Sequence, residues 1–277
     1  MPIWGGADMD RAVSQPDARL LPGRYAQAQD RLAALRRGTV FVALLLGVVI
    51  LIWTGIITAF DVPHFVAPSP KAVWGALTGE WAVLSQALAY TLRSTMAGMA
   101  LALILALALA TLFTFSELLS RAFLPLIVIL RTAPILAIAP LLIMIFGRGQ
   151  ATSVAVVVMV SFFPMMVNAA RGFRSARTNV LELMHVCGAR WWQTFLKVRL
   201  PFAAPFVFTG IRMAAAGAVL SAMLAEWLSG APGLGTLILE ASSFRRLPLM
   251  WAGVVLSMAA STSLYVLTVQ LERKMSR

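Results

Sequence analysis

Six long apolar segments constrain this chain more than any other feature of its sequence. Each is close to the ~20 residues that a helix needs to cross the ~30 Å hydrocarbon core of a bilayer. They cover residues 40–60, 88–115, 122–146, 152–169, 203–228 and 249–269. The 277 residues are 60% hydrophobic and only 12% charged, which leaves too little polar surface for a soluble protein. We therefore predict an all-α polytopic protein with six transmembrane helices in the lipid bilayer.

The Lys and Arg residues lie mostly on one side of these six spans. Sixteen of them fall before the first span, at residue 121, in the loop at 171–201 and at the C-terminus. Five fall on the other side, and an excess of this kind marks the cytoplasmic face. We expect both termini in the cytoplasm and a disordered tail over 1–37. A transmembrane domain over 38–277 would then carry the cytoplasmic loop.

The composition argues against several other classes of function. The net charge of +12 follows from this topology and does not predict nucleic-acid binding. One cysteine and two separated histidines do not predict a metal site or a bound cofactor. The chain has no G-x-x-x-x-G-K-S/T loop for ATP phosphates, and no span carries paired carboxylates or a nucleophile with its base. We therefore expect no catalytic residues.

The third apolar segment contains three prolines, Pro125, Pro134 and Pro140. Proline removes a helix hydrogen bond, and such a break survives in lipid only where neighbours or a cavity satisfy the freed carbonyl. The pattern fits either a kinked helix that lines a pathway or a kinked packing helix.

The cytoplasmic loop at 171–201 has the pattern of an ordered amphipathic segment. Its apolar residues follow steps of three and four on one helical face: Leu181, Met184, Trp191, Phe195 and Val198. Gly188 on the same face either admits a partner backbone or forms a turn between two short helices. Periodicity alone favours a helix lying on anionic lipid over a docking surface.

The spacing within this loop carries a more specific signal. Glu182 is followed after five residues by Gly188, after nine more by Val198, and after one more by Leu200-Pro201. This spacing resembles the EAA loop, the cytoplasmic loop of permease subunits of ABC importers. Ala189 matches the family's frequent Gly-Ala pair. Leu183 and Met184 depart from the family, which usually has Ala-Ala there.

Further motifs are similar to the nitrate/sulfonate/taurine branch of these permeases. They are Leu130-Arg131 with Pro134, Phe162-Phe163-Pro164 with Asn168, Gly210-Ile211-Arg212, and Ala225-Glu226 before Gly233-Leu234-Gly235. The last motif also looks like that of permeases for thiamine-pyrimidine precursors. The resemblance covers residues 40–274 and implies the type I ABC importer permease fold.

The resemblance also implies the partner subunits and the cellular location. Two separate ATPase subunits would use ATP, a second permease copy would complete a homodimeric pore, and an extracytoplasmic solute-binding protein would deliver the solute at the inner membrane. The solute would be a nitrate/sulfonate/taurine-like anion or a small heterocycle. The residues implied in ATPase coupling are Glu182, Leu183, Met184, Gly188, Ala189, Leu200 and Pro201.

Polar residues within the spans are candidates for the translocation pathway, because charges inside a bilayer are costly and usually functional. The candidates are Arg131, Pro134, Asn168, Arg212 and Glu226. Arg131 fits either an anion site or a structural partner, and we expect Arg212 to be structural. Asn168 is expected to bond the backbone, and Glu226 to pair with Arg93 or shape a gate.

The alternative to an ABC permease is a self-sufficient channel or secondary carrier. In that case the 171–201 loop would be a helix on the lipid surface. Co-purification with an ATPase subunit separates the two.

Overall fold

The computed structural model describes residues 44, 47–61, 63, 67–132 and 134–275. The predicted tail at 1–37 lies outside the described residues. The chain divides into two units, Met1–Val62 and Pro63–Arg277. Within the first unit, Gly47–Ala59 form a short apolar helix. Every regular element of the described residues in both units is a helix.

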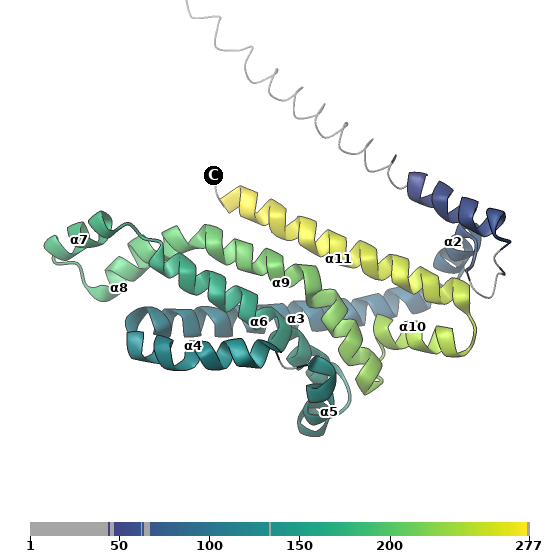
Figure 1. The fold of residues 1–277 in the computed structure, drawn as a ribbon, viewed down its shortest axis with the longest axis horizontal. Helices are drawn as coiled ribbons and strands as arrows, with labels where there is room; N and C mark the ends of the chain where they lie inside the picture. The colour runs from purple at the N-terminus through teal and green to yellow at the C-terminus, as the bar shows by residue number, and fades with distance from the viewer. Residues whose placement is uncertain (1–43, 45–46, 62, 64–66, 133, 276–277) are drawn as a thin grey trace, which may run out of the picture. The chain divides into compact units, whose positions relative to one another are not determined.

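The second unit consists of helices joined by short connections (Figure 1). They are α2 (Pro70–Gly79), α3 (Trp81–Phe115), α4 (Glu117–Thr132), α5 (Ile135–Phe146), α6 (Gln150–Arg174), α7 (Thr178–Val186), α8 (Trp191–Thr194), the π-helix η1 (Phe195–Arg199), α9 (Leu200–Ser229), α10 (Leu234–Ser243) and α11 (Leu247–Met275).

Four helices among the described residues are long and apolar enough to cross a membrane: Trp81–Phe115, Gln150–Arg174, Trp191–Ser229 and Leu247–Lys274. They correspond to the second, fourth, fifth and sixth predicted spans. The first predicted span is described only in part, as the helix at Gly47–Ala59.

The prediction of a kinked helix for the third span is wrong, because the segment forms two helices, α4 and α5. Pro134 is the N-cap of α5 and has an extended backbone, with φ −67° and ψ 122°. Proline has no N–H to continue the preceding helix, so the chain restarts here. Pro125 and Pro140 are accommodated inside α4 and α5.

The core of the second unit is formed by α3, α6 and α9, which pack closely through small residues. A Cβ at Gly98 would lie 2.5 Å from Val157 Cβ, and one at Gly210 would lie 3.0 Å from Met165 Cα. Small residues let membrane helices approach each other closely. The buried core residues are Met99, Ala102, Ala106, Phe113, Val157, Met165, Met166, Ala214, Ala215, Ala218, Val219, Ala222 and Leu264.

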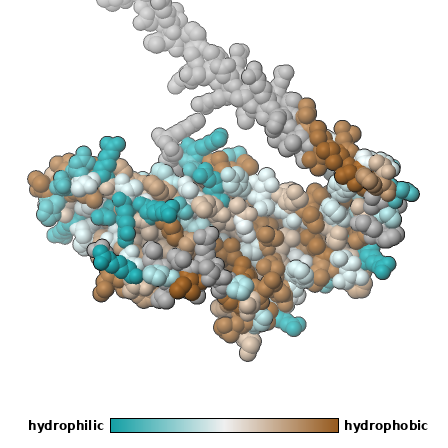
Figure 2. All heavy atoms as spheres, in the orientation of Figure 1, coloured by the Kyte–Doolittle hydropathy of each residue, from teal (hydrophilic) through white to brown (hydrophobic). Residues whose placement is uncertain are grey.

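The predicted single helical face over 181–198 is also wrong, because these residues are divided among α7, α8 and η1. α7 ends at Val186, and Gly188 has φ +65° in the connection to α8. Of the two possibilities for Gly188, the turn is confirmed, but only α7 is a short helix, because Trp191–Ser229 continue as one long helix. Hydrophilic residues gather at the end of the unit that carries α7 and α8, and apolar residues cover the region around α5 (Figure 2).

Candidate functional site

The first candidate site is α7 with the turn that follows it. α7 contains no buried residue, and Leu183 and Val186 are 61% and 84% exposed. Glu182 is also exposed, whereas Met184 is half-buried. In Figure 1, α7 extends beyond the ends of α6 and α9. An exposed helix of this length with large apolar side chains is a surface that can receive a partner.

The turn after α7 is a Schellman motif. The N–H of Ala189 donates to the carbonyl of Met184 at 3.0 Å, and the N–H of Gly188 donates to that of His185 at 3.0 Å. This motif needs a left-handed residue after the helix, which glycine adopts without a steric cost. It gives α7 a fixed end.

The predicted coupling residues fall into two groups. Glu182, Leu183 and Met184 lie on α7, and Gly188 and Ala189 follow in the turn. Leu200 and Pro201 lie beyond α8 and η1, at the start of α9. The structure therefore brings five of the seven together and separates the Leu-Pro pair from them.

Two arginines that the sequence analysis did not single out form hydrogen bonds at the two ends of the segment that carries α7 and α8. Arg174 at the end of α6 donates from Nη2 to Ser120 Oγ of α4 at 2.9 Å. Arg199 in η1 donates from Nη1 to the carbonyl of Phe173 at 3.1 Å. Their position in the predicted positive cytoplasmic loop was the only sequence signal, and it indicated topology rather than these bonds.

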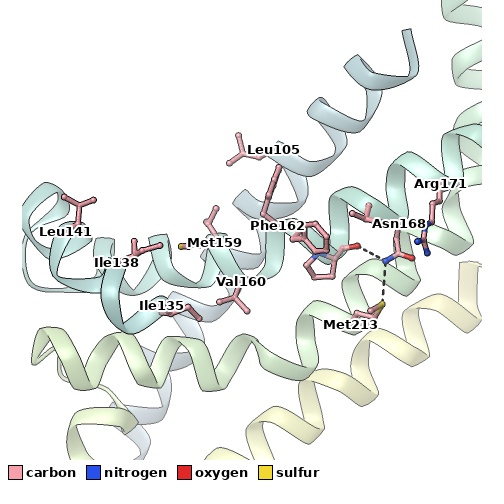
Figure 3. A pocket seen from close by; sticks show the side chains of 14 residues that line it. Leu105, Ile135, Ile138, Leu141, Met159, Val160, Phe162, Asn168, Arg171 and Met213 are labelled. Atoms are coloured by element: carbon pink, nitrogen blue, oxygen red, sulfur yellow. Dashed lines mark hydrogen bonds between the residues drawn. The ribbon is translucent and has the colours of Figure 1, made fainter. Parts of the chain in front are cut away.

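The second candidate site is a cavity of about 1080 Å³ between α3, α5, α6 and α9 (Figure 3). Its walls are mainly apolar, including Leu105, Ile135, Ile138, Met159, Phe162 and Met213. Asn168 and Arg171 supply polar groups at one end (Figure 3). Asn168 Nδ2 donates to the carbonyl of Pro164 at 2.7 Å, so its expected bond to the backbone is confirmed. Its role in a pathway stays a prediction.

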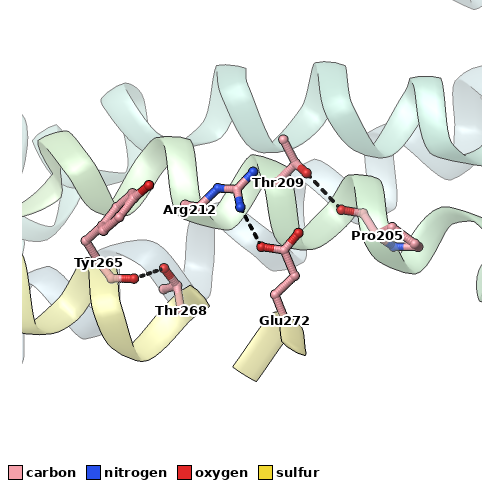
Figure 4. A network of polar contacts seen from close by, with 6 residues as sticks. All are labelled: Pro205, Thr209, Arg212, Tyr265, Thr268 and Glu272. Atoms are coloured by element: carbon pink, nitrogen blue, oxygen red, sulfur yellow. Dashed lines mark hydrogen bonds and ion pairs between the residues drawn. The ribbon is translucent and has the colours of Figure 1, made fainter. Parts of the chain in front are cut away.

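Arg212 forms an ion pair that links α9 to α11. Its Nη1 lies 2.8 Å from Glu272 Oε2 (Figure 4). Thr209 and Thr268 beside it donate to carbonyls of their own helices. The contact fits the expected structural role of Arg212. The side chain of Arg131 lies outside the described part of the chain, and Pro134 starts α5 without lining the cavity.

Glu226 does not pair with Arg93, so that expectation is wrong. Its carboxylate is fully buried, and Oε2 accepts hydrogen bonds from Thr91 Oγ1 at 2.9 Å and from the N–H of Gly235 at 3.0 Å. Arg93 is exposed. Two residues along an α-helix differ by ~200° in direction, which turns Thr91 inward and Arg93 outward. A threonine in an apolar span gives no sequence signal of this partnership.

Comparison with known proteins identifies the class. The chain is 33% identical over 222 residues to a Haemophilus influenzae protein named "Probable ABC transporter permease protein", which covers 80% of this chain and 91% of that one. It is 32% identical over 230 residues to the riboflavin transport system permease protein RibX of Chloroflexus aurantiacus, covering 81% and 85%. It is 37% identical over 157 residues to the formylaminopyrimidine transport permease protein ThiX of Halalkalibacterium halodurans, covering 55% and 63%.

The fold is similar to that of a solved ABC transporter chain. A chain of the methionine ABC transporter MetNI in an inward-facing conformation matches with a TM-score of 0.63 at 18% identity, covering 70% of this chain and 97% of that chain. At this identity the likeness concerns the fold alone. The described helices, four long and several shorter, are thus arranged like those of a type I ABC importer permease.

The fold and the relatives together define a permease subunit of an ABC importer. A family model described as "Binding-protein-dependent transport system inner membrane component" matches residues 98–277, and the chain belongs to that family. It is a multi-pass permease of the inner membrane. The family has no catalytic site and binds no cofactor; partner ATPases hydrolyse ATP, and a solute-binding protein is a further partner. The predicted resemblance is confirmed.

Proposed function

We propose that this permease forms half of a translocation pathway, that a second identical copy completes it, and that α7 with its turn docks on an ATPase subunit. The proposal rests on the observation that α7 buries none of its nine residues yet has a fixed end at Gly188. Transmission of ATPase movement needs a short ordered element rather than a loose loop.

The shape of the loop favours docking on a protein partner over lying on a lipid surface. A helix that lies on a bilayer buries one long apolar face in the interface. Here the helix is interrupted after nine residues, and the chain turns at Gly188 before α8. α7 is therefore a short exposed helix. Leu183 and Val186 offer apolar side chains to a partner, and Glu182 offers a negative charge.

The proposed topology has six spans, the third made of α4 and α5, with both termini and the 171–201 loop in the cytoplasm. The distribution of Lys and Arg supports it, since cytoplasmic loops carry the excess of positive charge. Residues 38–277 carry no internal sequence repeat that would supply a second half, so we propose that another copy completes the pore. Co-purification of two differently tagged copies tests the homodimer.

For the solute we propose a small heterocycle, with a sulfonate- or taurine-like organic anion as the second candidate and nitrate as the third. The cavity wall is mainly apolar, with one amide and one guanidinium at one end. Such a wall suits a solute with an apolar body and one polar edge. It offers little to replace the hydration of nitrate. The names of the riboflavin and formylaminopyrimidine relatives point the same way.

The solute class is tested on the solute-binding protein that serves this permease. Its thermal stability is measured with riboflavin, a formylated aminopyrimidine, taurine and nitrate as probes. We expect a rise in Tm with one of the heterocycles, because a ligand that binds only the folded state stabilises it. A rise with nitrate alone would contradict the proposed solute.

The docking site is tested with the cysteine that ends α7. Cys187 is exposed and is the only cysteine of the chain. In inverted membrane vesicles we expect a maleimide to label it, and to do so about tenfold more slowly once the ATPase is bound, because a buried contact excludes the reagent. A Cys187→Ser, Ser243→Cys protein is the control, with its thiol on α10, and should react only from the extracytoplasmic side. Unchanged labelling of Cys187 in the ATPase-bound complex would overturn the docking proposal.

A further inference from the structure

The segment between the proposed docking helix and α9 is fixed by aromatic rings. The ring of Phe195, the first residue of η1, lies 5.6 Å from that of Phe115 at the end of α3. It also lies 5.1 Å from the ring of Phe173 near the end of α6. Trp191 of α8 meets Phe115 edge-on at 5.2 Å. Phe195 is therefore the point at which the ends of two long helices and the entry to a third meet.

A hydrogen bond reinforces this aromatic junction, the cluster formed by the rings of Phe115, Phe173, Trp191 and Phe195. Arg199, four residues after Phe195, donates to the carbonyl of Phe173 at 3.1 Å. That carbonyl lies in the last turn of α6, where helix carbonyls lack partners within the helix. Val198 between them is buried. The α8–η1 segment is thus held to α3 and α6 by rings, a hydrogen bond and a buried valine, whereas α7 is held by no buried residue.

The junction coincides with a change in helix winding. Residues Phe195–Arg199 form a π-helix between α8 and α9, and the N–H of Leu200 donates to the carbonyl of Phe195. π-turns are rare and often occur at functional sites. A π-turn contains one more residue than an α-turn, so a change between the two rotates the helix that follows by ~100° per residue. A displacement of α8 can therefore become a rotation or shift of α9 at this point.

We propose that Phe195 is the positioning residue that passes the displacement of α7 and α8 to α3, α6 and α9. The inference rests on the proposed docking of α7 on an ATPase. With the ring in place, α8 cannot move without carrying the ends of α3 and α6 with it. Without the ring, only the Trp191–Phe115 contact, the Arg199–Phe173 hydrogen bond and Val198 would link α8 and η1 to the long helices, and less of the displacement would reach them.

The test uses the complete transporter, with ATPases and permease reconstituted in proteoliposomes, and needs no knowledge of the solute. In the Cys187→Ser background, the Met159→Cys thiol reports on the cavity through its reaction rate with N-ethylmaleimide. With Phe195 present, we expect this rate to differ about tenfold between the nucleotide-free and ATP–vanadate states, as an alternating pathway opens and closes. In Phe195→Ala we expect the difference between the two states to fall to about threefold or less, although ATPase binding and vanadate trapping remain.

Leu196→Ala is the matched control, since it alters the next residue of the same π-turn, whose side chain is 52% exposed. It should keep the full rate difference. Where Phe195→Ala does not reach the membrane, Phe115→Ala removes one of the same ring contacts from the α3 side and should halve or abolish the difference.

The outcomes separate the two proposals. A Phe195→Ala or Phe115→Ala transporter that binds ATPase and keeps the full difference in labelling rate between the two nucleotide states would overturn the role of Phe195. That result would leave the proposed function standing. A permease with Phe195 intact that binds no ATPase, or whose cavity does not respond to nucleotide, would overturn the proposed function itself.

Discussion

The carboxylate of Glu226 on α9 accepts a hydrogen bond from the hydroxyl of Thr91 on α3 at 2.9 Å. The same two side chains cap the start of α10, because the N–H of Gly235 donates to Glu226 and that of Leu234 donates to Thr91 Oγ1. The first N–H groups of a helix have no partners within it. A Cβ at Gly233 would overlap the Glu226 carboxylate, so glycine admits the contact. Three helices are therefore joined at one buried carboxylate.

Removing the Thr91 hydroxyl should destabilise the protein. In Thr91→Val, Glu226 and the N–H of Leu234 each lose a buried partner, and we expect a loss of about 1–3 kcal/mol in the free energy of unfolding. Thr95→Val is the control, because the Thr95 hydroxyl, also buried, bonds only to the carbonyl of Thr91 within α3. Thermal unfolding in detergent micelles compares the two. Equal shifts in Tm would mean that the link to α10 contributes nothing.

The ion pair between Arg212 and Glu272 should make a smaller contribution. Both side chains are partly exposed, at 32% and 21%, so solvent screens the pair. A double-mutant cycle with Arg212→Gln and Glu272→Gln should give a coupling energy of about 0.2–1 kcal/mol that falls as salt is added. The cycle is followed by unfolding at low and high salt. A coupling that is zero at low salt would remove the structural role assigned to Arg212.

Local composition was enough to predict α3, α6, α9 and α11, because a long apolar run has few other stable forms in a bilayer. It could not predict that the chain restarts at Pro134 and divides the third segment, since Pro125 and Pro140 carry the same signal and stay inside helices. Whether a proline breaks a helix depends on what its neighbours can satisfy.

The candidate site shows the same division between local and tertiary information. The spacing of Glu182 and Gly188 predicted the motif, and the preference of glycine for positive φ left the observed turn as one of two possibilities. The partner of Glu226 lies 135 residues away in sequence. Only the packing of α3 against α9 and α10 decides between Thr91 and Arg93.

Close packing between α3 and α6 predicts an asymmetric response to alanine. A methyl group at Gly98 would collide with the side chain of Val157, whereas one at Gly75 of α2 would meet nothing within 4 Å. Gly98→Ala should therefore lose about 1–3 kcal/mol of stability through overpacking. Gly75→Ala should be neutral or gain about 0.4–1 kcal/mol, because alanine restricts the unfolded chain more than glycine. Unfolding in micelles measures both, and a stable Gly98→Ala protein would contradict the tight helix contact.

The turn at Gly188 predicts which substitutions should impair ATPase docking. At φ +65° a β-branched residue is strained, whereas asparagine tolerates this conformation better than most residues. Gly188→Val should therefore disturb the end of α7 and weaken ATPase binding about tenfold, which corresponds to ~1.4 kcal/mol. Gly188→Asn adds a side chain of similar size but keeps the turn, so its affinity should stay within about threefold of that of glycine. Titration of the purified ATPase onto reconstituted permease measures both variants. Equal losses of affinity in the two variants would assign the effect to side-chain bulk at the contact. Only a loss of affinity confined to Gly188→Val supports a docking helix whose end is fixed by its glycine.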